Sequence, residues 1–461
     1  NPSQMAEDMK KKILEIIKNS DSYQNAIELS NSGSNNLEIS GLVGAGRSFF
    51  LYNWFNEFPG KYLVITKTEK EAFAIKNDIN EISGNGLAFQ FPCWNIKPYQ
   101  WKTPAAENIG ERLETLFNLQ NRENIIVTAS VQAILEPTIA PDELAVSSLH
   151  MEVNQEMTQD DLISRLTELG YERDPMVEEV GSFSVRGGIV DIFPYTTENP
   201  IRIEFFGDFI ESIRTFSVAN QRSIGTLDKM TLLPRRESLL TIAELDKFIE
   251  KLPQRDQEIL SDKFRFGIDT PGLEWATAFF NGKRPYLFDY IDSDTNLFLL
   301  EPELLKAESE DLNEMFENYF EQEREKYEEL PGPDRIYLEP EDFESRLDGH
   351  HRISEISFGK DSENVNFGMN EHPVINSQIK LLKSNIKSLQ QRHYSLYLAC
   401  DNTVQKDRMR DILEEDADWI STSVLDISEG FIYPQTNLAV LTDHQIFTRK
   451  FHRYRKSKIK E

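Results

Sequence analysis

The sequence predicts a multidomain α/β protein, in which a parallel-sheet domain carries an inserted α+β domain and is followed by a second, small α/β domain. Two observations lead to this prediction. Short β-branched runs alternate with apolar residues at helical spacing in the first and last parts of the chain, which is the pattern of helices covering a parallel sheet. Between residues 151 and 237, closely spaced strand patterns interrupt that alternation, so a separate domain is expected there.

The chain is long enough for several domains, roughly three or four of ordinary size. We divide its 461 residues into six segments, which are 1–150, 151–237, 238–350, 351–370, 371–452 and 453–461. The first and third segments form the parallel-sheet domain, the second is the insert, and the fifth is the small α/β domain. The fourth is expected to be a polar linker and the sixth a basic linker.

The first segment has the elements of a nucleotide-binding fold. A short amphipathic helix is expected at residues 9–17. Strands are predicted at 63–66 and 125–128, where every residue is apolar or β-branched. Helices are predicted at 69–82 and 109–119, where apolar side chains recur every three or four positions.

The insert is expected to begin with a helix and to continue as strands. Residues 158–161 have the pattern of a capping box, which opens a helix, and Gly170 ends that helix. Strands are predicted at 183–193 and 201–216, and the Gly-Asp pair at 207–208 is a hairpin turn within the second of these stretches.

Helical spacing returns after the insert. Helices are predicted at 242–252, 257–264, 303–329, 371–391 and 404–414, and strands at 297–300, 396–400 and 438–441. The helix at 303–329 is very acidic, which is most simply a solvated face.

A glycine-rich loop between a strand pattern and a helix pattern is the most informative feature of the first segment. Gly41, Gly44, Gly46, Arg47 and Ser48 follow the phosphate-binding pattern G-x-x-x-x-G-K-[ST], except that Arg47 stands in place of lysine. A guanidinium is wider and more rigid than the ammonium that such loops place on the phosphates. The loop therefore predicts a degenerate nucleotide site, whose backbone N–H groups still suit an anion. A glycine-rich turn that binds nothing is the alternative.

The acidic pair that an ATPase needs after a buried strand is also interrupted. The strand pattern at 297–300 continues into Glu301, Pro302 and Glu303, where Pro302 takes the place of the water-orienting acid. The chain also lacks the arginine-finger pattern Q-x-x-G-R-x-G-R. An exposed acidic turn is the simpler interpretation of Glu301 and Glu303, and we expect no catalytic residues and no ATP hydrolysis in this chain.

The charge of the chain restricts its partners. Fifty basic and 78 acidic residues give a net charge of −28, which repels a nucleic-acid backbone over most of the surface. The exception is a basic run made of Arg449, Lys450, Arg453, Arg455, Lys456, Lys458 and Lys460. This run is either a solvated linker or a tail that contacts DNA. Because the chain opens on Asn1 and stops within this run, we expect it to be a fragment.

No metal site and no disulfide are expected. Cys93 and Cys400 fall in different predicted domains, which suits the reducing cytoplasm. His350 and His351 lack the spacing of metal ligands and are interpreted as surface residues. No apolar run approaches the ~18–20 residues that span a bilayer, so we expect a cytoplasmic protein without a membrane partner.

The insert carries the richest predicted surface. Arg186 and Arg202 lie within alternating strand patterns. If Phe205 faces the core, Arg202 and Phe206 share the opposite face. An arginine beside an exposed phenylalanine on a rigid sheet is typical of protein interfaces. The alternative is that Phe206 packs in the core and Arg186 pairs locally with Asp191 or Glu204.

Motifs in and around the insert resemble those of known families. The sequences GSFSVRGGIVDIFP at 181–194 and RIEFFGD at 202–208 resemble the UvrA-binding domain shared by the excision-repair protein UvrB and the bacterial transcription-repair coupling factor, Mfd. The sequences FPCW at 91–94 and TPGLE at 270–274 are similar to the flanking module of the coupling factor. The resemblance covers most of the chain, from about residue 41 to residue 451.

The damaged nucleotide site favours the coupling factor over UvrB, which has an intact phosphate loop and acidic pair. The resemblance implies that Arg186, Arg202 and Phe206 contact UvrA, on a surface thought to be masked in the full-length protein. It implies no cofactor in this chain. ATP and magnesium would belong to a translocase motor, and RNA polymerase and DNA would bind domains that this chain does not contain.

The sequence thus predicts a non-catalytic module that recruits UvrA to RNA polymerase stalled at damaged DNA, in nucleotide excision repair. Its parent would be an ATP-dependent DNA translocase. The main alternative is a divergent UvrB-like helicase with an active ATPase that tolerates Arg47. A DNA-binding module that uses the basic run is a third possibility.

Overall fold

The computed structural model describes most of the chain, and the statements below concern those residues. They are 2–84, 86–238, 246–247, 249–258, 271–280, 282, 284–357 and 364–447. The helices predicted at 242–252 and 257–264 fall partly outside them, and the basic run 449–460 falls wholly outside. Among the described helices, none combines the length and the apolar character needed to cross a membrane.

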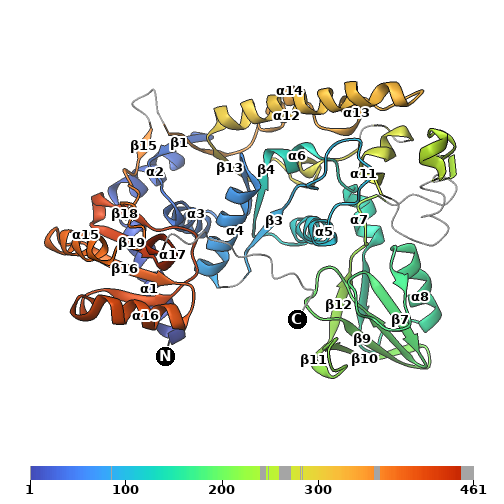
Figure 1. Ribbon diagram of the computed structural model, residues 1–461, viewed down its shortest axis with the longest axis horizontal. Helices are drawn as coiled ribbons and strands as arrows, with labels where there is room; N and C mark the ends of the chain where they lie inside the picture. Colours follow the sequence, from blue (N-terminus) through green and yellow to red (C-terminus); the bar gives the residue numbers. More distant parts are fainter. Residues whose placement is uncertain are drawn as a thin grey trace.

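A seven-stranded sheet, parallel at every strand pair, forms the centre of the molecule (Figure 1). Its strands, in spatial order, are β15 (Val365–Asn366), β1 (Asn36–Ser40), β14 (Arg352–Glu355), β13 (Asn296–Leu300), β2 (Lys61–Thr66), β4 (Ile125–Ser130) and β3 (Ala88–Phe91). Along β2, Leu63 and Ile65 face one hydrophobic core, whereas Tyr62 and Val64 face another. The sheet is therefore buried on both faces, as parallel sheets require, and the predicted multidomain α/β fold is confirmed.

Helices cover both faces of this sheet. One face packs against α1 (Pro2–Lys18), α2 (Asp21–Asn31), α3 (Ala45–Glu57) and α4 (Glu69–Ser83). The other face packs against α5 (Ala106–Asn121), α6 (Val131–Leu135), α7 (Pro141–Ser147), α11 (Leu273–Ala276), α12 (Pro302–Glu323), α13 (Pro333–Ile336) and α14 (Pro340–Arg346). The acidic helix predicted at 303–329 thus ends earlier, at Glu323, and a short 3₁₀ turn follows it.

The insert is a separate six-stranded sheet with its own core, at the lower right of Figure 1. Its strands, in spatial order, are β11 (Ser223–Leu227), β10 (Phe209–Phe216), β9 (Ile201–Phe206), β8 (Ile189–Ile192), β7 (Ser182–Arg186) and β6 (Glu172–Arg173). Helix α8 (Gln159–Glu168) packs on one face, and the predicted capping box between Thr158 and Asp161 opens it. The segments that lead into and out of the insert form an antiparallel strand pair, β5 (Leu149–Glu152) and β12 (Lys229–Leu232).

The small C-terminal domain is built on a four-stranded sheet of order β17-β16-β19-β18. Its elements are α15 (Ile379–Gln391), β16 (Ser395–Cys400), α16 (Thr403–Leu413), β17 (Ser421–Val424), β18 (Phe431–Tyr433), β19 (Leu438–Thr442) and α17 (Asp443–Ile446). Strands β16, β17 and β19 are parallel, and β18 is antiparallel to β19.

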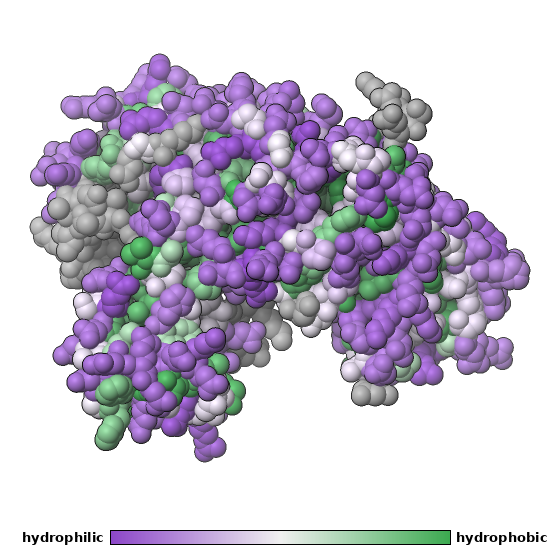
Figure 2. Space-filling model, turned by 180° about the vertical axis from the view of Figure 1, so that it is seen from behind, coloured by the Kyte–Doolittle hydropathy of each residue, from purple (hydrophilic) through white to green (hydrophobic). Residues whose placement is uncertain are grey.

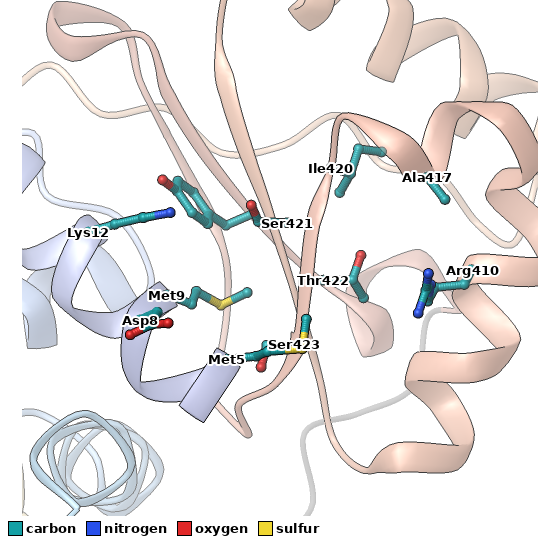
Figure 3. Close-up of a pocket in the computed structure, with 11 residues that line it drawn as sticks. Met5, Asp8, Met9, Lys12, Arg410, Ala417, Ile420, Ser421, Thr422 and Ser423 are labelled. Carbon is teal, nitrogen blue, oxygen red and sulfur yellow. The ribbon is translucent and has the colours of Figure 1, made fainter. Parts of the chain in front are cut away.

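The N-terminal helix α1 joins the parallel-sheet domain to the C-terminal domain. Its apolar face buries Met9, Ile13 and Ile17 in the same core as Tyr397 of β16. Figure 3 shows α1 beside the edge strand β17, with a cavity of about 330 Å³ between them. The helix predicted from its amphipathic pattern therefore acts as a contact between two domains.

Part of the linker predicted at 351–370 belongs to the main sheet, so that prediction is wrong for two short stretches. Strand β14 lies between β1 and β13, and β15 forms the edge beside β1. These strands have only four and two residues, but each buries an apolar side chain, Ile353 and Val365. Such short strands are held by pairing with β1, which the local sequence does not reveal.

Candidate functional site

The glycine-rich loop has the backbone context that the sequence predicts. Strand β1 ends at Ser40 and α3 begins at Ala45, so the loop leads from a buried strand into a helix N-terminus. Gly41 and Gly44 both have positive φ angles, 73° and 50°. A loop of this shape normally directs backbone N–H groups towards phosphate.

In this protein, residues from a later part of the same chain pack against the loop. The backbone N–H of Ala45 donates to the carbonyl of Glu429, at 2.8 Å. A Cβ atom on Gly44 would lie 2.7 Å from the carbonyl oxygens of both Glu429 and Gly430, and one on Gly46 would lie 2.5 Å from Sδ of Met369. The glycines therefore permit close packing of residues 369 and 429–430 against the loop, and one donor of the expected anion site is already occupied.

Arg47, the residue in the lysine position, is held by a carboxylate that the sequence did not single out. Its Nε and Nη2 atoms donate to the two carboxylate oxygens of Glu355, at 2.5 and 2.7 Å. Burial lowers the pKa of Arg47, but the charge and hydrogen bonds of Glu355 raise it above its usual value. A bidentate pair of this kind fixes the guanidinium plane, so Arg47 is directed at β14 rather than at a ligand.

Ser48, which would hold magnesium in a functional loop, instead contacts a buried carboxyl group. Its hydroxyl donates to Asp78 of α4, at 3.3 Å. The backbone N–H and the hydroxyl of Ser428 donate to the same carboxyl group, each at 2.6 Å. Burial raises the pKa of Asp78 to about 7, and the hydrogen bonds from Ser428 oppose that shift. Asp78 thus joins the loop to the C-terminal domain.

A second polar cluster, around His444, contacts Ser428. The Nδ1 atom of His444 lies 3.0 Å from the Asp401 carboxylate, and its Nε2 atom lies 2.8 Å from the Ser428 carbonyl. Burial lowers the pKa of His444, but both neighbours raise it above its usual value. Both ring nitrogens of His444 thus face oxygen acceptors within the protein. Asp401, Asp443 and His444 have the donor atoms of a metal site, and in this structure the two ring nitrogens of His444 contact Asp401 and Ser428.

A cavity of about 780 Å³ lies between the loop and the C-terminal domain. Its charged lining consists of Arg47, Lys70, Glu71, Asp78, Glu371, Glu429 and His444. Acidic and basic side chains therefore both line this cavity, beside the glycine-rich loop.

The predicted acidic motif follows β13. Glu301 has a positive φ of 55° and its backbone N–H donates to the carbonyl of Glu355, at 2.8 Å. The hydroxyl of Ser357 donates to the Glu301 carboxylate. Pro302 starts α12, and Glu303 is exposed in its first turn. This geometry matches the simpler interpretation of the motif as an acidic turn.

The three residues predicted for the insert surface lie on one side of its sheet. Arg202 binds Asp191 through Nε and Nη2, at 2.7 and 2.9 Å, and Arg186 reaches the same carboxylate at 3.4 Å. The Arg202 side chain is 18% exposed and the Arg186 side chain 51%. Phe206 is 76% exposed, so the alternative that it packs in the core is wrong. The predicted local pair between Arg186 and Asp191 is present.

The surroundings of Arg202 explain its low exposure. Its guanidinium lies 4.4 Å from the centre of the Phe216 ring and also donates to Gln221. The hydrogen bonds with Asp191 raise the pKa of Arg202, since they favour its charged form. Arg186 and Phe206 are therefore the more accessible members of the group.

Comparison with known proteins first identifies the class of the inserted domain. Residues 149–237 match the UvrB interaction domain. The six-stranded sheet, with its arginines and its exposed phenylalanine, lies within the matched residues. The chain therefore carries a domain of this class, set into a parallel-sheet domain.

The particular relatives are proteins named transcription-repair-coupling factor. The one from Bacillus subtilis (strain 168) is 30% identical over 329 residues, which are 66% of this chain and 28% of the relative. The one from Mycobacterium tuberculosis (strain CDC 1551 / Oshkosh) is 31% identical over 272 residues, or 55% and 22% of the two chains. The one from Staphylococcus epidermidis (strain ATCC 12228 / FDA PCI 1200) is 22% identical over 485 aligned positions, or 97% and 41%.

This chain thus spans less than half the length of these curated relatives. The resemblance to the UvrB-like N-terminal region of transcription-repair-coupling factors is confirmed.

Proposed function

We propose that this chain is the module of a transcription-repair coupling factor that recruits UvrA to RNA polymerase stalled at damaged DNA, in nucleotide excision repair. The observation that carries the proposal is the exposed Phe206 beside Arg186 on a rigid sheet, inside a UvrB interaction domain. A phenyl ring supplies desolvated apolar area, and a guanidinium supplies directional hydrogen bonds to carboxylates or carbonyls. Such residues dominate binding at protein interfaces.

The proposal includes the remainder of the protein. The parent would be an ATP-dependent DNA translocase located in the cytoplasm, whose further domains bind ATP, magnesium, DNA and RNA polymerase. Cys93 and Cys400 are both buried and are not joined in a disulfide, which supports a reducing compartment.

Titration of purified UvrA into the chain tests the UvrA contact. We expect Arg186→Ala and Phe206→Ala each to weaken binding by ~2 kcal/mol or more, as for a true interface anchor. Arg202→Ala should also weaken binding, but it removes the main partner of Asp191, so the folding of that variant must be checked by circular dichroism.

Matched control variants are available away from the insert. Arg324 has a side chain 54% exposed, close to that of Arg186, and Val404 is 72% exposed, close to Phe206. Arg324→Ala and Val404→Ala should bind UvrA like the wild type. Full binding by Arg186→Ala, Arg202→Ala and Phe206→Ala alike would defeat the proposal.

Masking of this surface in the full-length protein is part of the same proposal. The isolated chain should then bind UvrA more tightly than the full-length protein does, because Phe206 is 76% exposed among the described residues of this chain. Equal affinities of the two for UvrA would remove the basis for masking.

An active ATPase, the rival function, is disfavoured by the loop geometry. Arg47 is held by Glu355, and the Ala45 N–H is occupied by Glu429. Phosphate release measured with and without DNA distinguishes the two functions. We expect no turnover above background, whereas DNA-stimulated turnover would support the rival.

A further inference from the structure

A second phenylalanine stands beside Phe206 at the tip of the same hairpin. Phe209 is 49% exposed, and Phe206 and Phe209 are the only exposed phenylalanines among the described residues. The two are direct partners across the β9–β10 pair, and the neighbouring pair, Phe205 and Ile210, faces the core. Because direct partners in an antiparallel pair lie on the same face, Phe206 and Phe209 form one apolar pair on the outer side of the sheet.

The hairpin tip that carries this pair is also hydrogen-bonded on the side of β10 that faces away from β9, by residues 154–157. The N–H of Asn154 donates to the carbonyl of Ile210 at 2.8 Å, and the N–H of Ile210 donates to the carbonyl of Gln155 at 3.0 Å. The N–H of Met157 donates to the carbonyl of Asp208 in the turn, at 2.8 Å. A tip fixed in this way loses little conformational freedom when a partner covers it.

Charged groups surround the apolar pair on the same face. Strand register places Glu204 opposite Ser212, and this pair is the nearest one to the phenylalanines on the same face. Ile189 of β8 lies opposite both Glu204 of β9 and Arg186 of β7, so Arg186 is two strands away from Glu204 on that face. Glu204 accepts hydrogen bonds from Ser212 at 2.9 Å and from Arg214 at 3.0 Å. Glu204 is therefore satisfied within the sheet, and Arg186, at 51% exposed, is more accessible than Arg214, at 39%. Figure 2 shows the insert at the lower left, with hydrophobic patches among hydrophilic residues.

We propose that Phe209 is a further contact residue, which pairs with Phe206 to fill one apolar recess of the partner while Arg186 meets a carboxylate at its rim. This inference rests on the proposed function and specifies the partner surface. That surface must offer an apolar depression wide enough for two phenyl rings, bordered by an acidic group. Burial of both rings supplies more apolar area than Phe206 alone provides.

Titration of UvrA into Phe209→Ser, Phe206→Ser and the double variant tests this inference. We expect Phe209→Ser to raise the Kd about tenfold or more, as for an interface anchor. Phe209→Leu should lie between the wild type and Phe209→Ser, because it keeps part of the apolar area. Since both rings fill one recess, the double variant should lose less than the sum of the single losses.

The control is Ile224→Ser, which removes a side chain 59% exposed on β11 of the same sheet. It should bind UvrA with unchanged Kd. If Phe206→Ser weakens binding while Phe209→Ser stays within twofold of the wild type, the inference fails and the proposed function stands. If neither variant weakens binding, the inference fails, and it takes the proposed function with it if Arg186→Ala and Arg202→Ala also bind fully.

Discussion

At the scale of single residues, buried carboxyl groups organise this protein. Asp78 accepts hydrogen bonds from Ser48 of the loop and from Ser428 of the C-terminal domain. Asp191 accepts from Arg186 and Arg202 in the insert. In each case one carboxyl group, almost fully removed from solvent, fixes side chains that come from separate elements.

The ionisation of Asp78 makes stability depend on pH. Its pKa is about 7 in the folded protein because of burial, against ~3.9 when unfolded. Between these values the folded state binds more protons, so this group lowers stability as pH rises, by on the order of 2 kcal/mol from pH 5 to pH 7. Asp78→Asn keeps the shape without the titration. In urea unfolding at pH 5, 6, 7 and 8, the free energy of unfolding should fall less with rising pH for the variant than for the wild type. An equal fall for both proteins would contradict the assignment of this pH dependence to Asp78.

At the scale of elements, the loop between β1 and α3 packs against another domain of the same chain. Its shape is that of a phosphate loop, but its close contacts are the carbonyls of Glu429 and Gly430. A loop that in other proteins binds a ligand therefore binds a domain of the same chain.

Gly44→Ala tests this use of the loop. The added methyl group would lie 2.7 Å from two backbone carbonyls, at a φ of 50°. Gly349→Ala is the control, since its φ is also positive at 82° but nothing lies within 4 Å of the new Cβ. We expect Gly44→Ala to cost ~2 kcal/mol more than the control, because it adds overpacking to the shared backbone strain. Faster hydrogen exchange at residues 428–431 should accompany it, and equal costs would count against the docking role.

Local patterns were sufficient to predict many elements, whereas long-range pairings were not. The capping box at Thr158 opens α8 as predicted, because its hydrogen bonds join residues three positions apart. Arg47 and Glu355 are 308 positions apart, and the strand that carries Glu355 has only four residues. The sequence therefore revealed that Arg47 departs from the phosphate-loop pattern, but no local pattern pointed to the carboxylate that binds it.

At the scale of the whole molecule, a buried arginine connects the insert to the parallel-sheet domain. Arg112 of α5 is fully buried, and its Nε atom donates to Glu237 at 2.8 Å, where the chain leaves the insert. It also contacts Glu136, at 3.3 Å, and the carbonyl of Pro137. Its guanidinium carbon lies 4.0 Å from the centre of the Phe91 ring.

Arg112→Ala should destabilise the protein strongly, because it removes a buried cation that bonds Glu136 and Glu237 and leaves a cavity in its place. We expect a loss of about 3–5 kcal/mol in the free energy of unfolding, measured with urea at pH 7. Arg122→Ala is a suitable control. Arg122 is exposed at the C-terminal end of α5, the helix that contains Arg112, and its side chain donates a hydrogen bond to Asn118. It should cost less than about 1 kcal/mol. A small loss for Arg112→Ala would show that the insert is attached by other contacts.

The occupied loop has a consequence for how this protein can evolve. Arg47→Lys would restore the sequence pattern of a nucleotide site, but Glu355 would lose its bidentate partner and the Glu429 carbonyl would still cover the Ala45 N–H. A phosphate that used the Ala45 N–H would have to displace the Glu429 carbonyl, which belongs to another domain. Single substitutions within the loop therefore cannot free that donor, because the group that occupies it lies outside the loop.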